Sequence, residues 1–184
     1  MNSIQEWIEK YHGEYEGGLV KNLNSPVGKY SYQQKSGSIE IEGTTISINF
    51  NEVGGAIPVA EPIRMTLHLK KTYETELTLF PKGLGHKFLD FVLPKRKISI
   101  PESIRKQFRF DGDKNLLKKL TSDSTFTESI LDENIYIDTG KEPIDRIVLT
   151  PAHGIKDVEQ FEKFVFILKR IENALKTIHQ NPVA

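Results

Sequence analysis

Hydrophobic residues near the end of the chain recur at alternating steps of three and four positions. Residues with this spacing lie on one stripe of an α-helix, here over positions 156–179. The series consists of Phe161, Phe164, Leu168, Ile171, Leu175 and Ile178. Charged residues, Lys169 and Glu172 among them, fall elsewhere on the helix, so the stripe has to be buried against another element. The pattern predicts a long terminal helix that packs on the strands preceding it.

Apolar and polar residues alternate with a period of two at positions 63–70, where Met65 and Leu67 flank Thr66. This is the period of a strand with one buried face. Similar or shorter signals predict further strands at 30–33, 38–42, 45–51, 75–80, 98–100, 108–110, 134–138 and 145–150. One-sided alternation is typical of an antiparallel sheet with one covered face and one face in water.

Capping and breaking residues mark the remaining elements. A first helix begins at Asn2 or Ser3 and ends at Gly13. Further helices begin, in chain order, at Pro101, Asp113 and Asp123 or Ser124. Positions 14–28 are interpreted as irregular, 35–37 as a hairpin turn and 51–62 as a long loop. Positions 81–94 fit a short helix or a buried strand equally well.

The order of these elements predicts an α+β fold. We expect a twisted antiparallel sheet, with N-terminal, central and long C-terminal helices packed mainly on one face. The chain of 184 residues has the length of one domain, and we expect it to form a single domain over 1–184. A chain of this length buries a substantial core without covalent cross-links.

Composition removes several classes of chemistry. The chain has no cysteine, which excludes disulfides, thiolate metal sites and a cysteine nucleophile. Lysine plus arginine equals aspartate plus glutamate, at 25 each, so the net charge favours no polyanionic partner. No apolar run approaches the roughly 20 residues that span a bilayer. The first residues lack the features of a secretory signal, and together these observations predict a cytoplasmic protein without a transmembrane segment.

Two short motifs resemble ligand loops without completing them. Asp111 to Asn115 begins like a calcium loop, but Leu116 and Ser122 stand where that loop needs glycine and glutamate. The turn at 83–85 has two glycines, but position 88, where a dinucleotide fingerprint needs a third, is phenylalanine. We therefore expect no bound metal and no cofactor.

His68 is the histidine that we single out. No two of the five histidines have the spacing of a local metal site. His68 lies on the polar face of its predicted strand, and an open sheet face can carry a site. One hypothesis is therefore an enzyme whose site assembles from distant residues, with His68 and a carboxylate such as Glu76 close together.

A basic segment carries a second hypothesis. It contains Lys95, Arg96 and Lys97 and continues to Arg109, with two phenylalanines nearby. Such a segment could bind an anionic surface, either nucleic acid or lipid headgroups. Nucleic acid is not favoured, because the chain has no net positive charge and no RNA-recognition signature. The acidic stretch at 123–145 could instead neutralise the basic one across the protein surface.

The second half of the chain also has a familiar order. A Phe108-Arg109-Phe110-Asp111-Gly112-Asp113 segment leads into a leucine-bearing helix, then two strands and the amphipathic terminal helix. This order resembles a broad group of uncharacterised bacterial α+β domains, some of which lie beside membrane-spanning segments. At the level of fold it also looks like small α+β proteins of the secretion-chaperone type. The resemblance implies a fold and no activity.

These observations favour a non-catalytic binding or assembly module whose partner is an unknown protein or small molecule. We expect the contact surface on the open sheet face and in the loop at 51–62. The residues proposed for that surface are Gly54, Gly55, Ile57, His68, Lys95, Arg96 and Lys97. A cavity for an apolar molecule would form if the sheet curved around the last helix. Pairing of the helical stripe with a second copy of the chain stays open.

Overall fold

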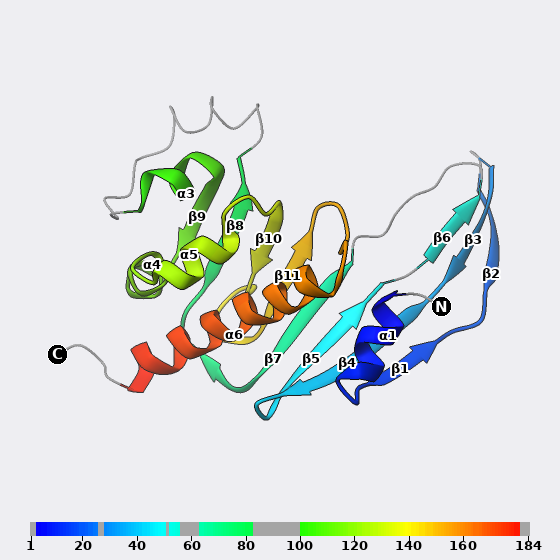
Figure 1. Ribbon diagram of the computed structural model, residues 1–184, viewed down its shortest axis with the longest axis horizontal. Helices are drawn as coiled ribbons and strands as arrows, with labels where there is room; N and C mark the ends of the chain where they lie inside the picture. Colours follow the sequence, from blue (N-terminus) through cyan, green and yellow to red (C-terminus); the bar gives the residue numbers. More distant parts are fainter. Residues whose placement is uncertain (1–2, 26–27, 51, 56–62, 83–99, 181–184) are drawn as a thin grey trace.

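An antiparallel β-sheet of eight strands forms the centre of the protein (Figure 1). The computed structural model describes residues 3–25, 28–50, 52–55, 63–82 and 100–180. In spatial order the strands are β1 (Glu14–Gly17), β4 (Lys35–Ile41), β5 (Thr44–Asn49), β7 (Arg64–Tyr73), β11 (Ile144–Pro151), β10 (Ile135–Asp138), β8 (Leu77–Pro81) and β9 (Phe108–Gly112). Every neighbouring pair in this sheet is antiparallel, as the alternation predicts.

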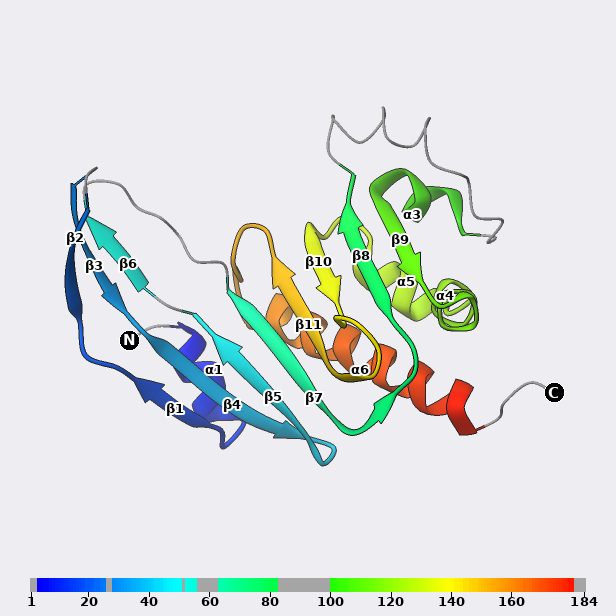
Figure 2. The same ribbon diagram turned by 180° about the vertical axis from the view of Figure 1, so that it is seen from behind.

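The helices lie mainly on one face of this sheet. They are α1 (Ser3–Lys10), α3 (Glu102–Gln107), α4 (Lys114–Thr121), α5 (Ser124–Ile130) and α6 (Val158–Gln180). Figure 1 shows α6 and α1 in front of the strands, and Figure 2, from behind, shows the strands in front of both helices. The predicted α+β class and the one-sided placement of the helices are confirmed. Among the residues that the structure describes, no helix covers the other face of the sheet.

The terminal helix α6 is the main cover of the sheet. Its predicted stripe is buried: Phe161, Phe164, Leu168, Ile171 and Leu175 are each 0% exposed, and Ile178 is half-buried. The helix contacts β7 and β11 of the sheet and the neighbouring helices α4 and α5. Each fully buried leucine or phenylalanine contributes roughly 1.5–3 kcal/mol. Because the stripe is covered by its own chain, it is not available to pair with a second copy.

Two glycines let the first helix approach the sheet closely. An ideal Cβ on Gly37 would lie 2.2 Å from Cδ1 of Ile8, and one on Gly13 would lie 2.2 Å from the backbone oxygen of Ser38. A side chain at position 13 would force the backbone of β4 to move, and one at position 37 would force the end of the Ile8 side chain to turn away. The hairpin turn predicted at 35–37 is wrong, because these residues belong to β4. Gly37 lies inside β4 and serves close packing of the helix, whereas the sequence signal was that of a turn.

A second, three-stranded sheet extends from one side of the first (Figure 1). Its strands are β2 (Lys21–Ser25), β3 (Gly28–Gln33) and β6 (Glu52–Gly55), in the order β2-β3-β6. The same three stretches of chain also form the edge of the large sheet, where they run as β1, β4 and β5. Gly18 N donates to the Gln34 backbone oxygen at 2.7 Å where the pairing is interrupted. We call this smaller sheet the ribbon.

The ribbon and β1 correct two sequence predictions. Positions 14–28 are not irregular, because they contain β1, β2 and the first residue of β3. Part of the loop predicted at 51–62 is strand β6. β1 lies at the sheet edge and its residues are largely exposed, so it carries no apolar alternation. Pairing with a distant strand holds it in place, and a local pattern cannot report such pairing.

Both predicted aspartate caps are confirmed. The Asp113 side chain accepts hydrogen bonds from the backbone N–H groups of Asn115 and Leu116, at 2.8 and 2.9 Å, and thereby caps α4. Asp123 caps α5 in the same way. A cap of this kind contributes about 1 kcal/mol. Positions 83–99, which include most of the segment left open at 81–94, lie outside the described residues, and Ile100 is not in a strand.

Candidate functional site

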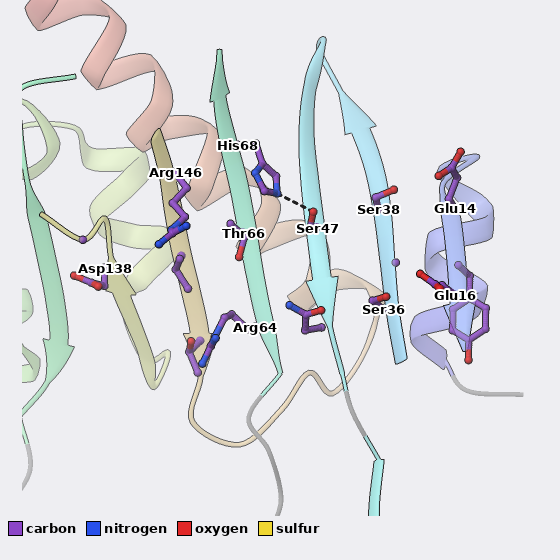
Figure 3. Close-up of a pocket in the computed structure, with 16 residues that line it drawn as sticks. Glu14, Glu16, Ser36, Ser38, Ser47, Arg64, Thr66, His68, Asp138 and Arg146 are labelled. Carbon is purple, nitrogen blue, oxygen red and sulfur yellow. Dashed lines mark hydrogen bonds between the residues drawn. The ribbon is translucent and has the colours of Figure 1, made fainter. Parts of the chain in front are cut away.

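A hollow of about 1190 Å³ lies on the open face of the large sheet. Side chains from six adjacent strands line it, from β1 at the edge to β10. Figure 3 shows these side chains on the near side of the strands, with α6 behind them. The sequence predicted a possible cavity between the sheet and the last helix. The hollow instead lies on the opposite face, because the large side chains of α6 are packed against the sheet.

Strand alternation explains the polar character of the hollow. On β7, Met65 and Leu67 point into the core, so Arg64, Thr66 and His68 point the other way. Residues that are partners across neighbouring strands form a continuous row over six strands: Glu14, Ser38, Ser47, Thr66, Val148 and Asp138. A second row, one pleat away, consists of Glu16, Ser36, Asn49 and Arg64.

Three basic side chains lie in the middle of the hollow. Arg64 and His68 come from β7, and Arg146 comes from β11, where it is the cross-strand partner of His68. Both arginines are exposed, and neither has an ion pair with any residue that the structure describes. The carboxylates of the hollow, from Glu14 and Glu16 on β1 and Asp138 on β10, lie at its two ends. Across the strands the lining therefore changes from carboxylates on β1 to hydroxyl groups on β4 and β5, then to basic side chains on β7 and β11, and ends with a carboxylate on β10.

His68 forms its hydrogen bond with Ser47 rather than with a carboxylate. Ser47 Oγ lies 2.8 Å from His68 Nε2, as the dashed line in Figure 3 marks. Glu76, proposed as its partner, is exposed on the turn before β8 and does not line the hollow. A serine beside a histidine is two parts of a nucleophilic triad. Among the described residues, no carboxylate makes a hydrogen bond to His68 that would orient its ring.

No metal site accompanies the hollow in the described part of the chain. Within those residues, no group of three histidine, aspartate or glutamate side chains could hold an ion. Asp111 and Asp113 belong instead to a turn and a helix cap: Asp111 Oδ1 accepts from the N–H of Gly112. None of the described helices is long and apolar enough to cross a membrane.

Of the proposed binding residues that the structure describes, one lies in the hollow. His68 lines the hollow, whereas the backbones of Gly54 and Gly55 pair with β3 in the ribbon. Ile57 and the basic residues Lys95, Arg96 and Lys97 lie outside the described residues. Sequence reasoning missed Arg64, although it shares the strand face of His68 and the alternation pointed to it. Arg146 could not have been found without the register between β7 and β11.

A second polar cluster lies on the covered face, under α6. The Glu172 side chain is fully buried, and its carboxylate lies 2.7 Å from Nζ of both Lys169 and Lys176. It also accepts a hydrogen bond from Thr44 Oγ1 at 2.9 Å. Burial acts to raise the pKa of Glu172, but the hydrogen bonds from Lys169, Lys176 and Thr44 outweigh it and hold the pKa below its usual value of 4.5. The cluster is shielded from the hollow by the sheet and is structural.

The same cluster affects its tyrosine neighbour. Burial, and then the negative charge of Glu172, raise the pKa of Tyr73 above its usual value of 10.0. The sequence placed Lys169 and Glu172 off the apolar stripe. The structure shows that both are nevertheless buried. Lys169 is 8% exposed, and its Nζ donates a hydrogen bond to Thr44 Oγ1 at 3.2 Å.

Comparison with known proteins bears on the fold. No protein-family model matches the chain, and no curated protein matches it. One solved structure that is similar is the crystal structure of the mycobacterial trehalose monomycolate transport factor A, TtfA. The TM-score is 0.55 at 10% sequence identity, over 95% of this chain and 93% of that one. At this identity the likeness is one of fold alone.

Proposed function

We propose that the protein is a non-catalytic binding module that receives its ligand on the open face of the large sheet. The observation that carries the proposal is the hollow, in which two arginines have no ion-pair partner among the described residues. The sheet, covered by α6 on its other face, fixes the backbone positions from which these side chains extend. Such pre-organisation lowers the entropic cost of binding.

Two further observations favour binding over catalysis. The Ser47 and His68 pair lacks an orienting carboxylate among the described residues, and such a third group is part of the usual arrangement for an activated serine. TtfA is described as a transport factor, and transport requires contact with a cargo or a partner rather than a chemical step. Its likeness in fold is compatible with a module of the same general kind.

A tryptophan placed in the hollow tests the proposal. Ser38, on β4, is the second of the six residues in the row and has no side-chain hydrogen bond within the described residues, so Ser38→Trp fills space without removing a hydrogen bond. In NMR titrations with a panel of small acids, amines, sugars and short peptides, we expect ligands to shift backbone amide signals of β5, β7 and β11. Ser38→Trp should weaken their binding about tenfold or more, or roughly 1.4 kcal/mol.

The matched control is Ser103→Trp, at an exposed position of α3 remote from the hollow. This variant should bind the same ligands as the natural chain. Ligands whose shifts map to the ribbon or to the helices, with no effect of Ser38→Trp, would contradict the proposal.

An enzyme that uses Ser47 as a nucleophile is the second candidate, favoured by the 2.8 Å contact with His68. A fluorophosphonate probe distinguishes the two, because it forms a covalent adduct only with an activated serine. We expect intact-mass spectrometry to find no adduct on the natural chain beyond the level seen with Ser47→Ala. Stoichiometric labelling that disappears in both Ser47→Ala and His68→Ala would favour the enzyme.

The described part of the basic segment gives little support to the anionic-surface hypothesis. The Arg109 guanidinium lies over the Phe80 ring, 5.8 Å from its centroid, and Lys106 pairs with Glu102 of the same helix. The acidic stretch is not neutralised by the basic segment either, as far as the described residues show. Its ion pairs come from α6, where Arg170 meets Asp123 and Lys163 meets Glu133.

A further inference from the structure

We infer that the hollow binds the anionic group of an acidic, hydroxyl-bearing small molecule, with a carboxylate or phosphate held between Arg64 and Arg146. The inference rests on the proposed function and specifies its ligand. The anion would lie over Thr66 and Val148, which are cross-strand partners at the junction of β7 and β11.

The register of the two strands sets this position. Arg64 lies two residues from Thr66 on β7, and Arg146 lies two residues from Val148 on β11. Because β7 and β11 are antiparallel, the two arginines fall on opposite sides of the Thr66–Val148 pair. Each Cα is then roughly 7 Å along the strands from that pair, within the length of an arginine side chain. Figure 3 shows both side chains on the open face of the sheet.

The two arginines favour a negative partner between them. Two guanidinium groups on one face repel each other, and neither is neutralised by a described residue. Their planar forks fit carboxylate and phosphate oxygens in paired hydrogen bonds. His68, opposite Arg146, adds a ring nitrogen to the same side of the hollow. The small side chains of Ser38, Ser47 and Thr66 leave room for a ligand above the strands.

The lining residues beyond the two arginines indicate which chemical groups the rest of the ligand carries. From Thr66 the row continues through the hydroxyl groups of Ser47 and Ser38 to the carboxylate of Glu14 on β1. Three strand steps cover roughly 14 Å. Short hydroxyl side chains both donate and accept hydrogen bonds, and the carboxylate accepts them from hydroxyl or amino groups. Val148 is the one aliphatic side chain among the described lining residues, so the surface suits a polar body and not a lipid tail.

The experiment titrates the whole chain with defined probes at low salt. The probes are inorganic phosphate, glucose 6-phosphate, glucuronate and uncharged glucose, followed through the side-chain Nε–Hε signals of Arg64 and Arg146 and by calorimetry. We expect glucose 6-phosphate or glucuronate, or both, to bind saturably and at least about tenfold more tightly than glucose. Comparison of the two acids tells whether the site prefers a phosphate or a carboxylate. Inorganic phosphate reports the arginine pair without the polar body.

Matched variants locate the effect. Arg64→Gln and Arg146→Gln should each weaken acid binding about tenfold, and the double variant should abolish it. Arg105→Gln, which removes an exposed arginine of α3, should leave it unchanged. Unaltered amide spectra of the free variants would show that the fold is retained, as expected for exposed side chains.

The outcomes separate the two proposals. If acids fail to bind, or bind equally well to the double arginine variant, the inference is wrong. If a neutral or basic ligand then binds in a manner sensitive to Ser38→Trp, the binding module stands with a different ligand. If nothing in the panel reaches the open face, both are overturned.

Discussion

Replacing Glu172 by glutamine is expected to lower the free energy of unfolding by about 3–5 kcal/mol. The carboxylate is 0% exposed and lies 2.7 Å from two ammonium groups, one of which, on Lys169, is itself largely buried. Glutamine removes the negative charge and leaves that lysine buried without its main partner. Breaking a buried ion pair from one side costs much more than a surface pair contributes. Urea unfolding followed by circular dichroism measures the change.

Glu162→Gln is the matched control on the same helix. Glu162 also pairs with a lysine, Lys10 at 3.1 Å, but its side chain is 45% exposed and water screens the pair. The control should change stability far less than Glu172→Gln. If the two variants were equally stable, the polar cluster under α6 would have no structural role.

The acid dependence of stability gives a second measure of Glu172. Because its pKa in the folded protein lies below the usual 4.5, the unfolded chain binds more protons than the folded one in acid. The stabilisation is therefore present above about pH 4.5 and is lost as the pH falls through the folded-state pKa. The difference in stability between the natural chain and Glu172→Gln should shrink over that range. A constant difference would assign the effect to packing.

Replacing Gly112 by alanine is the second large effect that we expect, at about 3 kcal/mol. Gly112 ends β9 with φ +132°, a conformation that residues with a side chain rarely adopt. An ideal Cβ there would also lie 2.2 Å from the backbone oxygen of Glu76, which cannot move aside without disturbing β8. Thermal and urea unfolding of Gly112→Ala measure the combined cost of strain and clash.

Gly140→Ala separates the two costs. Gly140 also has a positive φ, +76°, but nothing lies within 4 Å of its ideal Cβ. This variant should lose only the conformational part, about 1 kcal/mol. If Gly112→Ala were no worse than Gly140→Ala, the approach of β8 to β9 would be looser than the structure indicates.

Local patterns predicted the parts of the fold that local forces determine. The stripe of α6 follows from helical periodicity, and the strand at 63–70 follows from alternation, because each pattern appears in consecutive residues. The caps at Asp113 and Asp123 were predictable for the same reason: the side chain bonds N–H groups two and three residues away. Of the ribbon, the strand predicted at 30–33 is confirmed as part of β3. β2 was missed because its sequence KNLNS has no apolar alternation, and β6 was missed because its partner β3 lies far earlier in the chain.

The candidate site was predictable only in part. Alternation placed His68 on the open face, and the same argument applies to Arg64, two pleats away on that face. The pairing of His68 with Ser47 instead of Glu76 depended on the order β5-β7 in the sheet. Arg146 lies in the site because of the register between β11 and β7, and no local pattern in the sequence predicts that register.

The amino-acid sequence by itself determined that this chain forms α+β elements with one long amphipathic helix, since periodicity and capping act over a few residues. Tertiary structure decided which strands became neighbours, and thereby which side chains share the hollow. Tertiary structure also decided the structural role of single residues. Gly37 allows close packing of α1 and is not part of a turn, and Glu172 is buried beside two lysines. The reason is physical. A strand completes its hydrogen bonds only with another strand, so the surface made by several strands exists only once their order and register are established.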